Sequence, residues 1–224
     1  MLPAITVSDA ISDLPAFDWK DPHQVYAGPD RIEIERENRG IKQLEVVAGR
    51  ATGFYKVEYA AKPFNSFQER MRVFNGEAAR RVTQHQTSGF KALAVERVVN
   101  VALRPGADCD SWSEPDVDKP ALLGSTHMHR WQQDHFKFER IDGSRYFKAL
   151  MTTATVQSSL LHPDQRRIFT VRECARAQGI PDWVEFQSSD GNLLSAYKQI
   201  GNAVPVPLAV ALGKSLTAAR IRDL

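Results

Sequence analysis

The sharpest local signal in this sequence is the stretch TVRECARAQGIPD, residues 170–182. It opens with Thr170 and has Glu173 three residues later, which is the Thr-x-x-Glu pattern of a helix capping box. Gly179 stands where a helix C-terminal cap belongs, and a proline follows two residues later. The stretch therefore predicts a short helix over residues 171–178.

A second informative stretch lies downstream: QIGNAVPVP, residues 199–207. A glycine, an amide and two prolines predict a tight turn, followed by a final helix that begins near Pro207. Such a turn could present backbone groups and the Asn202 side chain to a polar small molecule such as a nucleoside. The alternative is a rigid loop in which Asn202 caps the final helix. One stripe of that helix is apolar and predicts a partner surface: Leu208, Leu212 and Leu216.

Upstream, residues 66–104 hold seven basic and three acidic side chains, and five acids follow in residues 105–118. Ser66 and Glu69 repeat the capping-box pattern and predict a short amphipathic helix. Its expected apolar stripe is Phe67, Met71 and Phe74, and its expected polar face carries Arg70 and Arg72. This segment could contact a phosphate backbone, and a solvated helix face is the alternative.

The remaining elements mix helices with strands. We expect a two-turn helix after Thr6 that ends at Pro15. Paired strands are expected at residues 43–47 and 54–59 across a turn at 49–53, with a helix at 90–101. Further strands are expected between residues 136 and 156, with a hairpin turn at Asp142-Gly143. The fold class predicted for the chain is α+β.

Composition sets broad bounds. The chain has 224 residues, of which 42% are hydrophobic and 25% charged, and its net charge is +2. These values describe one generous globular domain or two small ones and exclude collagen, wholesale disorder and a membrane bundle. The longest nearly apolar run, residues 203–212, is about half of what a membrane span needs. No secretory leader is readable in residues 1–9, and two cysteines favour a reducing compartment.

A search for catalytic chemistry finds no complete centre. His127 and His129 would share one face of a strand, but they lack enough further ligands, so no metal site is expected. No Gly-x-Gly phosphate cradle occurs, and neither Cys109 nor Cys174 neighbours a histidine. Cys174 lies inside the helix of residues 171–178, where we expect a buried, small apolar side chain.

Three stretches resemble the last two conserved motifs of DNA cytosine-5 methyltransferases: residues 161–167 (LHPDQRR), 170–182 and 199–205. The resemblance is closest to the eukaryotic maintenance-type branch, because it continues upstream. Residues 6–15 are similar to the entry to that branch's target-recognition domain, and residues 67–70, 103–106 and 127–131 are similar to waypoints inside it.

The resemblance implies a division of the chain. Residues 1–17 would lead in from the catalytic domain, residues 18–160 would form a β-containing target-recognition domain, and residues 161–224 would be C-terminal catalytic-domain elements. The helices of the last part would complete a Rossmann-like S-adenosylmethionine-dependent methyltransferase domain that is missing here. The family's Pro-Cys nucleophile and cofactor-binding glycine motifs are absent from this sequence. We therefore expect no catalytic residue in this chain and no turnover by it alone.

The resemblance also implies roles for individual residues. Asn202 and Val204 would close over S-adenosylmethionine, as a partial site only. The candidate DNA phosphate contacts are Arg70, Arg72, Arg80 and Arg81. Arg172, Glu173 and Arg176 would form internal ion pairs. The expected partners are double-stranded DNA and the N-terminal catalytic half, in the nucleus and without a membrane or zinc.

Three interpretations remain open at this point. The chain could be part of an enzyme that acts only with its catalytic half, a standalone DNA-binding or regulatory module, or a fragment that folds poorly alone. An exposed Leu208, Leu212 and Leu216 stripe would favour the first or third, because an autonomous module rarely leaves such a patch uncovered.

Overall fold

The computed structural model describes residues 4–17, 19, 51–89, 98, 101–108, 139–148, 160–187 and 193–222. The helices are α1 (Val7–Ile11), α3 (Ser66–Arg72), α6 (Val171–Ala177), α7 (Leu194–Asn202) and α8 (Val206–Arg222). The strands are β1 (Ala51–Glu58), β2 (Val73–Phe74), β3 (Glu77–Ala78), β4 (Arg81–Ser88), β5 (Glu139–Arg140) and β6 (Leu160–Leu161). This mixture of helices and strands agrees with the expected α+β class.

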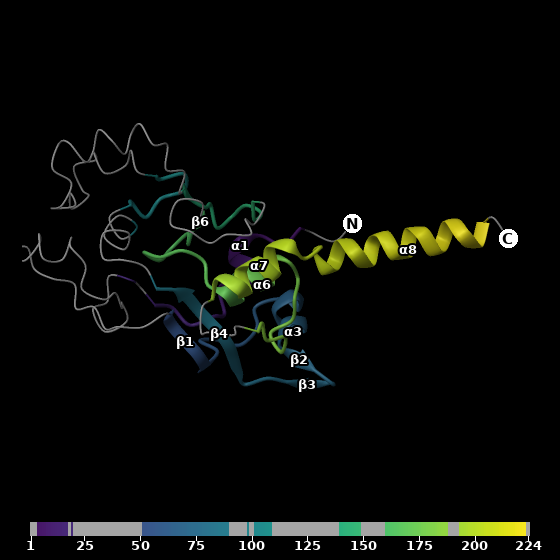
Figure 1. Ribbon diagram of the computed structural model, residues 1–224, viewed down its shortest axis with the longest axis horizontal. Helices are drawn as coiled ribbons and strands as arrows, with labels where there is room; N and C mark the ends of the chain where they lie inside the picture. Colours follow the sequence, from purple (N-terminus) through teal and green to yellow (C-terminus); the bar gives the residue numbers. More distant parts are fainter. Residues whose placement is uncertain are drawn as a thin grey trace, which may run out of the picture.

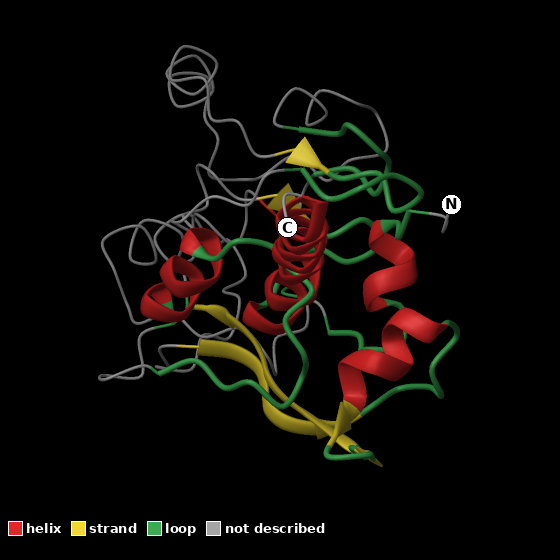
Figure 2. Cartoon of the chain, turned by 90° about the vertical axis from the view of Figure 1, so that its right-hand side faces the viewer, coloured by secondary structure: helices red, strands yellow, loops and turns green. Residues whose placement is uncertain are grey.

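Helix α6 lies at the centre of the described part and packs against α1, α7 and β4 (Figures 1 and 2). The capping box predicted for it is present: the Thr170 hydroxyl accepts from the Glu173 amide, and the Glu173 carboxylate accepts from the Thr170 amide. Its C-terminus is closed by Gly179, whose φ of +69° suits glycine. The amides of Gly179 and Ile180 donate to the carbonyls of Arg176 and Ala175, the two bonds of a Schellman motif. The predicted helix is confirmed.

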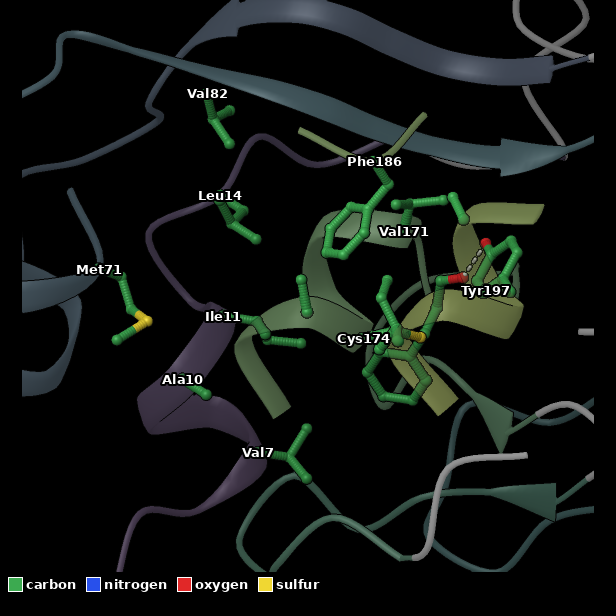
Figure 3. Close-up of a cluster of buried hydrophobic side chains, with 14 of the residues drawn as sticks. Val7, Ala10, Ile11, Leu14, Met71, Val82, Val171, Cys174, Phe186 and Tyr197 are labelled. Atoms are coloured by element: carbon green, nitrogen blue, oxygen red, sulfur yellow. Dashed lines mark hydrogen bonds between the residues drawn. The ribbon is translucent and has the colours of Figure 1, made fainter. Parts of the chain in front are cut away.

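Apolar side chains from distant parts of the chain meet around α6 (Figure 3). The cluster joins residues of α1, α3, β4, α6 and α7, and its fully buried members include Val7, Val82, Val171, Ala175 and Ala196. Burial of this apolar surface supplies the main stabilisation of the described body. Residues on both sides of the expected boundaries at 17 and 160 share this one core.

The main sheet is an antiparallel pair of β1 and β4, with Phe54 opposite His85 and Val57 opposite Val82. The expected strand at residues 54–59 is therefore present, but it begins at Ala51. The turn expected at 49–53 is wrong for residues 51–53, which lie in β1. The expected partner strand at 43–47 and most of the expected helix at 90–101 lie outside the described residues.

Helices α1 and α3 begin at side-chain caps. The Thr6–Asp9 capping box of α1 confirms the predicted first helix. For α3 the cap is Asn65, whose side chain accepts from the Gln68 amide, and not the expected Ser66. The helix ends at Arg72, so Phe74 lies in β2 and is exposed instead of extending the apolar stripe.

The expected hairpin around Asp142-Gly143 is wrong. A turn is present there, since the Arg145 amide donates to the Asp142 carbonyl at 3.1 Å. However, residues 141–148 form no strand, and β5 pairs in parallel with β6 instead. Parallel strands are joined by a long connection. The alternation of residues within one short segment therefore cannot predict this pairing.

The C-terminal region departs from expectation in one respect. Residues 199–202 are the last turn of α7 and not part of a tight turn; the break between helices is confined to residues 203–205. Helix α8 then extends away from the body as a single long rod (Figure 1). None of the helices in the described ranges is both long and apolar enough to span a bilayer.

Candidate functional site

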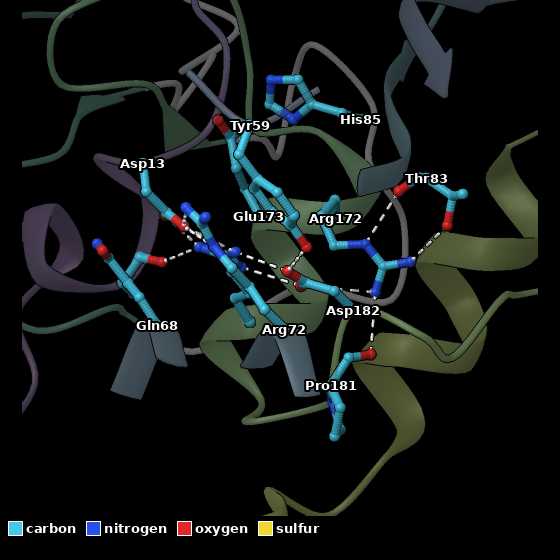
Figure 4. A network of polar contacts seen from close by, with 12 residues as sticks. Asp13, Tyr59, Gln68, Arg72, Thr83, His85, Arg172, Glu173, Pro181 and Asp182 are labelled. Atoms are coloured by element: carbon cyan, nitrogen blue, oxygen red, sulfur yellow. Dashed lines mark hydrogen bonds and ion pairs between the residues drawn. The ribbon is translucent and has the colours of Figure 1, made fainter. Parts of the chain in front are cut away.

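The C-terminal half of α6 carries a buried ion-pair network, drawn in Figure 4. The Arg176 guanidinium donates to the Asp13 carboxylate at 2.5 Å and to the Asp182 carboxylate at 2.6 Å. All three side chains are almost completely buried. Burial alone would lower the pKa of Arg176, but its bonds to Asp182 and Asp13 outweigh this and raise it. The network holds α1, α6 and the loop after α6 in fixed positions.

Arg72 joins the same network from α3, and this corrects the expectation that it lies on a polar face. Its guanidinium is buried, donates to Asp13 and to the Ala61 carbonyl, and lies 3.7 Å from the centre of the Tyr59 ring. The Tyr59 hydroxyl donates to Asp182 at 2.6 Å. Burial and the adjacent Asp182 charge raise the pKa of Tyr59. Arg72 therefore has a structural partner inside the protein and is not available to a DNA phosphate.

The N-terminal half of α6 carries a second pair. Arg167 donates to both carboxylate oxygens of Glu173, at 2.7 and 2.8 Å. Burial would raise the pKa of Glu173, but the charge and hydrogen bonds of Arg167 outweigh it and lower the pKa strongly. His162 lies against the same carboxylate, 3.6 Å away. Burial lowers the pKa of His162 to about 3, so this imidazole is neutral at physiological pH.

Arg172 lies on the face of α6 that meets β4. It donates to the Thr83 carbonyl at 3.0 Å and to the carbonyls of Pro181 and Val184, and it lies 4.0 Å from Asp182. The prediction that Arg172, Glu173 and Arg176 make internal ion pairs is therefore confirmed. These side chains fix the fold around α6 and do not face solvent.

Phe17 forms a clamp with the segment before α6. Its amide donates to Gln165, and its carbonyl accepts from Arg167, both at 3.1 Å. The Arg167 guanidinium also lies 4.3 Å from the centre of the Phe17 ring. Gly53 lies so close that a Cβ atom there would come within 2.7 Å of this ring. We call these contacts of Phe17 with Gln165 and Arg167 the Phe17 clamp.

The predicted cofactor residues lie between α7 and α8. Asn202 is the last residue of α7, and both its side chain and that of Val204 are exposed, the latter by 59%. The alternative that Asn202 caps the final helix is wrong, because α8 begins at Val206 and its N-cap position is Pro205. Both side chains are thus free to meet something outside this chain.

The predicted DNA contacts divide into two groups. Arg70, Arg80 and Arg81 are exposed, on α3, on the residue before β4 and on β4. Arg81 makes only a loose surface pair with Glu58 at 3.8 Å. Arg72 belongs to the buried network. Three of the four arginines are therefore exposed, and their contact with a phosphate backbone stays a prediction.

Cys174 is the buried, small apolar side chain that the sequence predicts. It is a free cysteine inside the core, and burial raises the pKa of its thiol. A thiol held neutral in this way is a poor nucleophile. The described residues hold no group of three or more His, Cys, Asp or Glu side chains placed for a metal ion. His127, His129 and Cys109 lie outside those residues.

Sequence reasoning missed several residues of the buried network, namely Tyr59, Asp182 and Arg167 as partners of α6. Asp182 and Arg167 lie within the stretches that carry the family resemblance, and this position could have marked them as candidates for the network. Tyr59 had no such signal, because its contact with Asp182 spans 123 residues.

Comparison with solved structures identifies a protein with a similar fold. The chain is similar to a DNA modification methyltransferase encoded within an E. coli prophage, with a TM-score of 0.50, 16% identity, and coverage of 91% of this chain and 44% of that one. At this identity the likeness concerns the fold alone. It agrees with the mixed architecture described above.

Sequence comparison then gives the family. The model of C-5 cytosine-specific DNA methylases matches residues 65–218, and the chain belongs to this family. It is 40% identical over 95% of its length to DNA (cytosine-5)-methyltransferase PliMCI of Paracentrotus lividus, covering 14% of that protein. It is 32% identical over 89% of its length to DNA (cytosine-5)-methyltransferase 1B of Oryza sativa subsp. japonica, covering 15% of it. The chain thus spans about a seventh of these relatives.

Proposed function

We propose that this chain is the C-terminal part of a DNA cytosine-5 methyltransferase of the eukaryotic maintenance-type branch. Residues 1–17 lead in from the catalytic domain, residues 18–160 form the target-recognition domain, and residues 161–224 complete the catalytic domain. In this role the chain acts with an N-terminal catalytic half, joined in one polypeptide or as a separate subunit. The whole enzyme transfers a methyl group to C5 of cytosine in DNA.

The observation that carries this proposal is the exposed apolar surface of α8. Leu208, Leu212 and Leu216 are exposed by 49%, 53% and 72%. Val206 and Val210 are also about half exposed, and at 100° per residue they lie on the opposite side of the helix from Leu208. A helix that is apolar on opposite sides is normally buried within a larger domain. We infer that the catalytic half covers α8.

The cofactor would be met by Asn202 and Val204. S-adenosylmethionine, when bound, supplies the electrophilic methyl group. The Asn202 amide can both donate and accept hydrogen bonds, and Val204 offers an apolar surface, which suits a nucleoside with polar edges and flat faces. Both side chains are exposed at the base of α8, next to the surface that we assign to the catalytic half.

We infer that the chain alone performs no methyl transfer. The family's reaction flips the cytosine out of the duplex and needs a cysteine thiolate that adds to C6 before C5 can take the methyl group. Cys174 is buried with its pKa raised. Neither it nor Cys109 follows a proline, as the family's nucleophile does. The catalytic half must therefore supply the thiolate.

Double-stranded DNA would lie against the recognition region. Arg70, Arg80 and Arg81 are exposed and can contact phosphates, which position a protein on the duplex without reading its sequence. We propose a nuclear location, because the relatives that the chain matches are eukaryotic DNA methyltransferases. We assign no membrane partner.

The test is a methyl-transfer assay with labelled S-adenosylmethionine and duplex DNA. It compares the chain alone, the catalytic half from the same genome alone, and a mixture of the two. Activity in the mixture only is expected. If all three samples are silent while this chain still binds DNA, it is a binding module and not part of an enzyme. Activity of the chain alone would refute the argument from the missing thiolate.

A further inference from the structure

We propose that Gln178 is a positioning residue for the segment 200–206, which carries Asn202 and Val204. The inference rests on the proposed function, because it assigns to Gln178 a role in cofactor affinity. Gln178 is the C-cap residue of α6 and is buried. It does not touch the cofactor in this proposal; it acts through the segment that does.

Gln178 holds both ends of that segment. Its side-chain amide donates to the Ile200 carbonyl at 3.2 Å, and its own carbonyl accepts from the Val206 amide at 2.9 Å. The five residues between these two anchors are the last two residues of α7, Gly201 and Asn202, and the break between the helices at 203–205. One residue thus fixes where the segment leaves the body and where it returns.

Gly179 makes this close approach possible. A Cβ atom at this position would lie 2.6 Å from Pro207 Cδ and 3.8 Å from Val206 Cβ. The first contact is shorter than carbon atoms allow, so the start of α8 packs directly on the backbone of Gly179. The hydrogen bonds and the packing are independent observations, and both tie the end of α6 to the segment 200–206.

The position of Gln178 is linked to α3 through buried ion pairs near the end of α6. Arg176, two residues earlier, is held by Asp13 and Asp182, and Asp13 also binds Arg72 of α3. The segment 200–206 is therefore pre-organised by the same helix that anchors the recognition elements. Pre-organisation of a binding segment lowers the entropy lost on binding and strengthens affinity.

The test uses the reconstituted enzyme, made of this chain with its catalytic half, and the variant Gln178→Met, which keeps the side-chain length but removes the donor. We expect its KM and Kd for S-adenosylmethionine to rise about 3- to 10-fold, the range for loss of one neutral hydrogen bond. The KM for DNA should stay within about twofold. Gln178→Asn, which keeps the amide on a shorter side chain, should raise the KM for S-adenosylmethionine by an intermediate factor. It keeps the proposal testable if Gln178→Met misfolds.

The matched control is Gln68→Met. Gln68 is also a buried glutamine whose amide donates to a backbone carbonyl, that of Asp9 at 2.8 Å, but it lies in α3. Its variant should lower the unfolding midpoint and leave the KM for S-adenosylmethionine unchanged. A cofactor KM that Gln178→Met does not move, or that both Met variants raise equally, would overturn the positioning role. If the wild-type enzyme transfers no methyl group, the proposed function fails, and the inference fails with it.

Discussion

The guanidinium of Arg176 donates to the Asp13 carboxylate at 2.5 Å, although 163 positions separate the two residues in the chain. Asp13 accepts from Arg72 as well, so one carboxylate lies between two buried cations. This arrangement joins the turn after α1 to helices α3 and α6.

Asp13→Ala should therefore destabilise the fold severely. The substitution leaves Arg72 and Arg176 buried with Asp182 as the remaining carboxylate nearby, and breaking a buried ion pair in this way costs about 3–5 kcal/mol. Urea unfolding followed by circular dichroism measures the loss. Asp142→Ala, at a surface turn, is the control and should lose much less. Equal losses in the two variants would contradict the structural role of the network.

Acid should destabilise the fold through His85. Burial lowers its pKa to about 4, and it bridges the Thr170 hydroxyl and the Pro15 carbonyl as a neutral ring. The unfolded chain takes up this proton near pH 6.5, whereas the folded chain does so only near pH 4. Between these values the unfolded state binds more protons, so the free energy of unfolding falls as the pH falls, by about 3 kcal/mol in all.

His85→Gln tests this dependence. The glutamine amide can still donate to the Pro15 carbonyl, but it does not titrate. We expect the decline in stability between pH 7 and pH 4.5 to become shallower, with the remainder due to His162, whose pKa is also lowered. An unchanged slope would show that His85 does not control the acid response.

How much of this the sequence could predict depends on how local each feature is. The α6 helix was predictable because Thr170, Glu173 and Gly179 act within one or two turns. The cap of α3 was displaced by one residue because Asn65 and Ser66 are both good caps. Pairing of β1 with β4 and of β5 with β6 was not predictable, because it joins segments about 20 or more residues apart.

The candidate site shows the same division. Helical periodicity places Arg72 on a polar face, but Asp13 and Tyr59 come from elsewhere in the chain and make that face an interior one. No local pattern contains this information. Asn202 and Val204, in contrast, are predicted as cofactor contacts from the resemblance alone. The structure leaves both side chains exposed, and their role stays a prediction.

The exposed arginines should govern DNA affinity through its salt dependence. Replacing Arg70, Arg80 and Arg81 together with alanine should weaken duplex binding and reduce the slope of log K against log salt by about 2–3, since each phosphate contact contributes about 0.9. Fluorescence anisotropy at several salt concentrations measures this slope. The control removes the same charge from the C-terminal region, with Lys198, Lys214 and Arg220 changed to alanine. An equal reduction in both variants would indicate a general charge effect.

Leu212 should be needed for association with the catalytic half but not for folding. It is exposed by 53%, so Leu212→Asp should leave the unfolding midpoint of the chain nearly unchanged and abolish complementation in the methyl-transfer assay. Leu103→Asp is the matched control, because Leu103 is exposed by 48% and lies outside α8. Full complementation by the Leu212 variant would mean that α8 is not the contact surface.

The Phe17 clamp has a consequence for how this family can vary. The chain leaves the Phe17 clamp after Phe17 and returns to it at Gln165. The two ends of the intervening segment therefore lie next to each other. The entropy lost in closing a loop grows only with the logarithm of its length, so insertions between these points are inexpensive. Parts of the intervening segment other than α3, β1 and β4 can therefore change in length at little cost, whereas these three elements must be kept because they belong to the core and ion-pair network around α6.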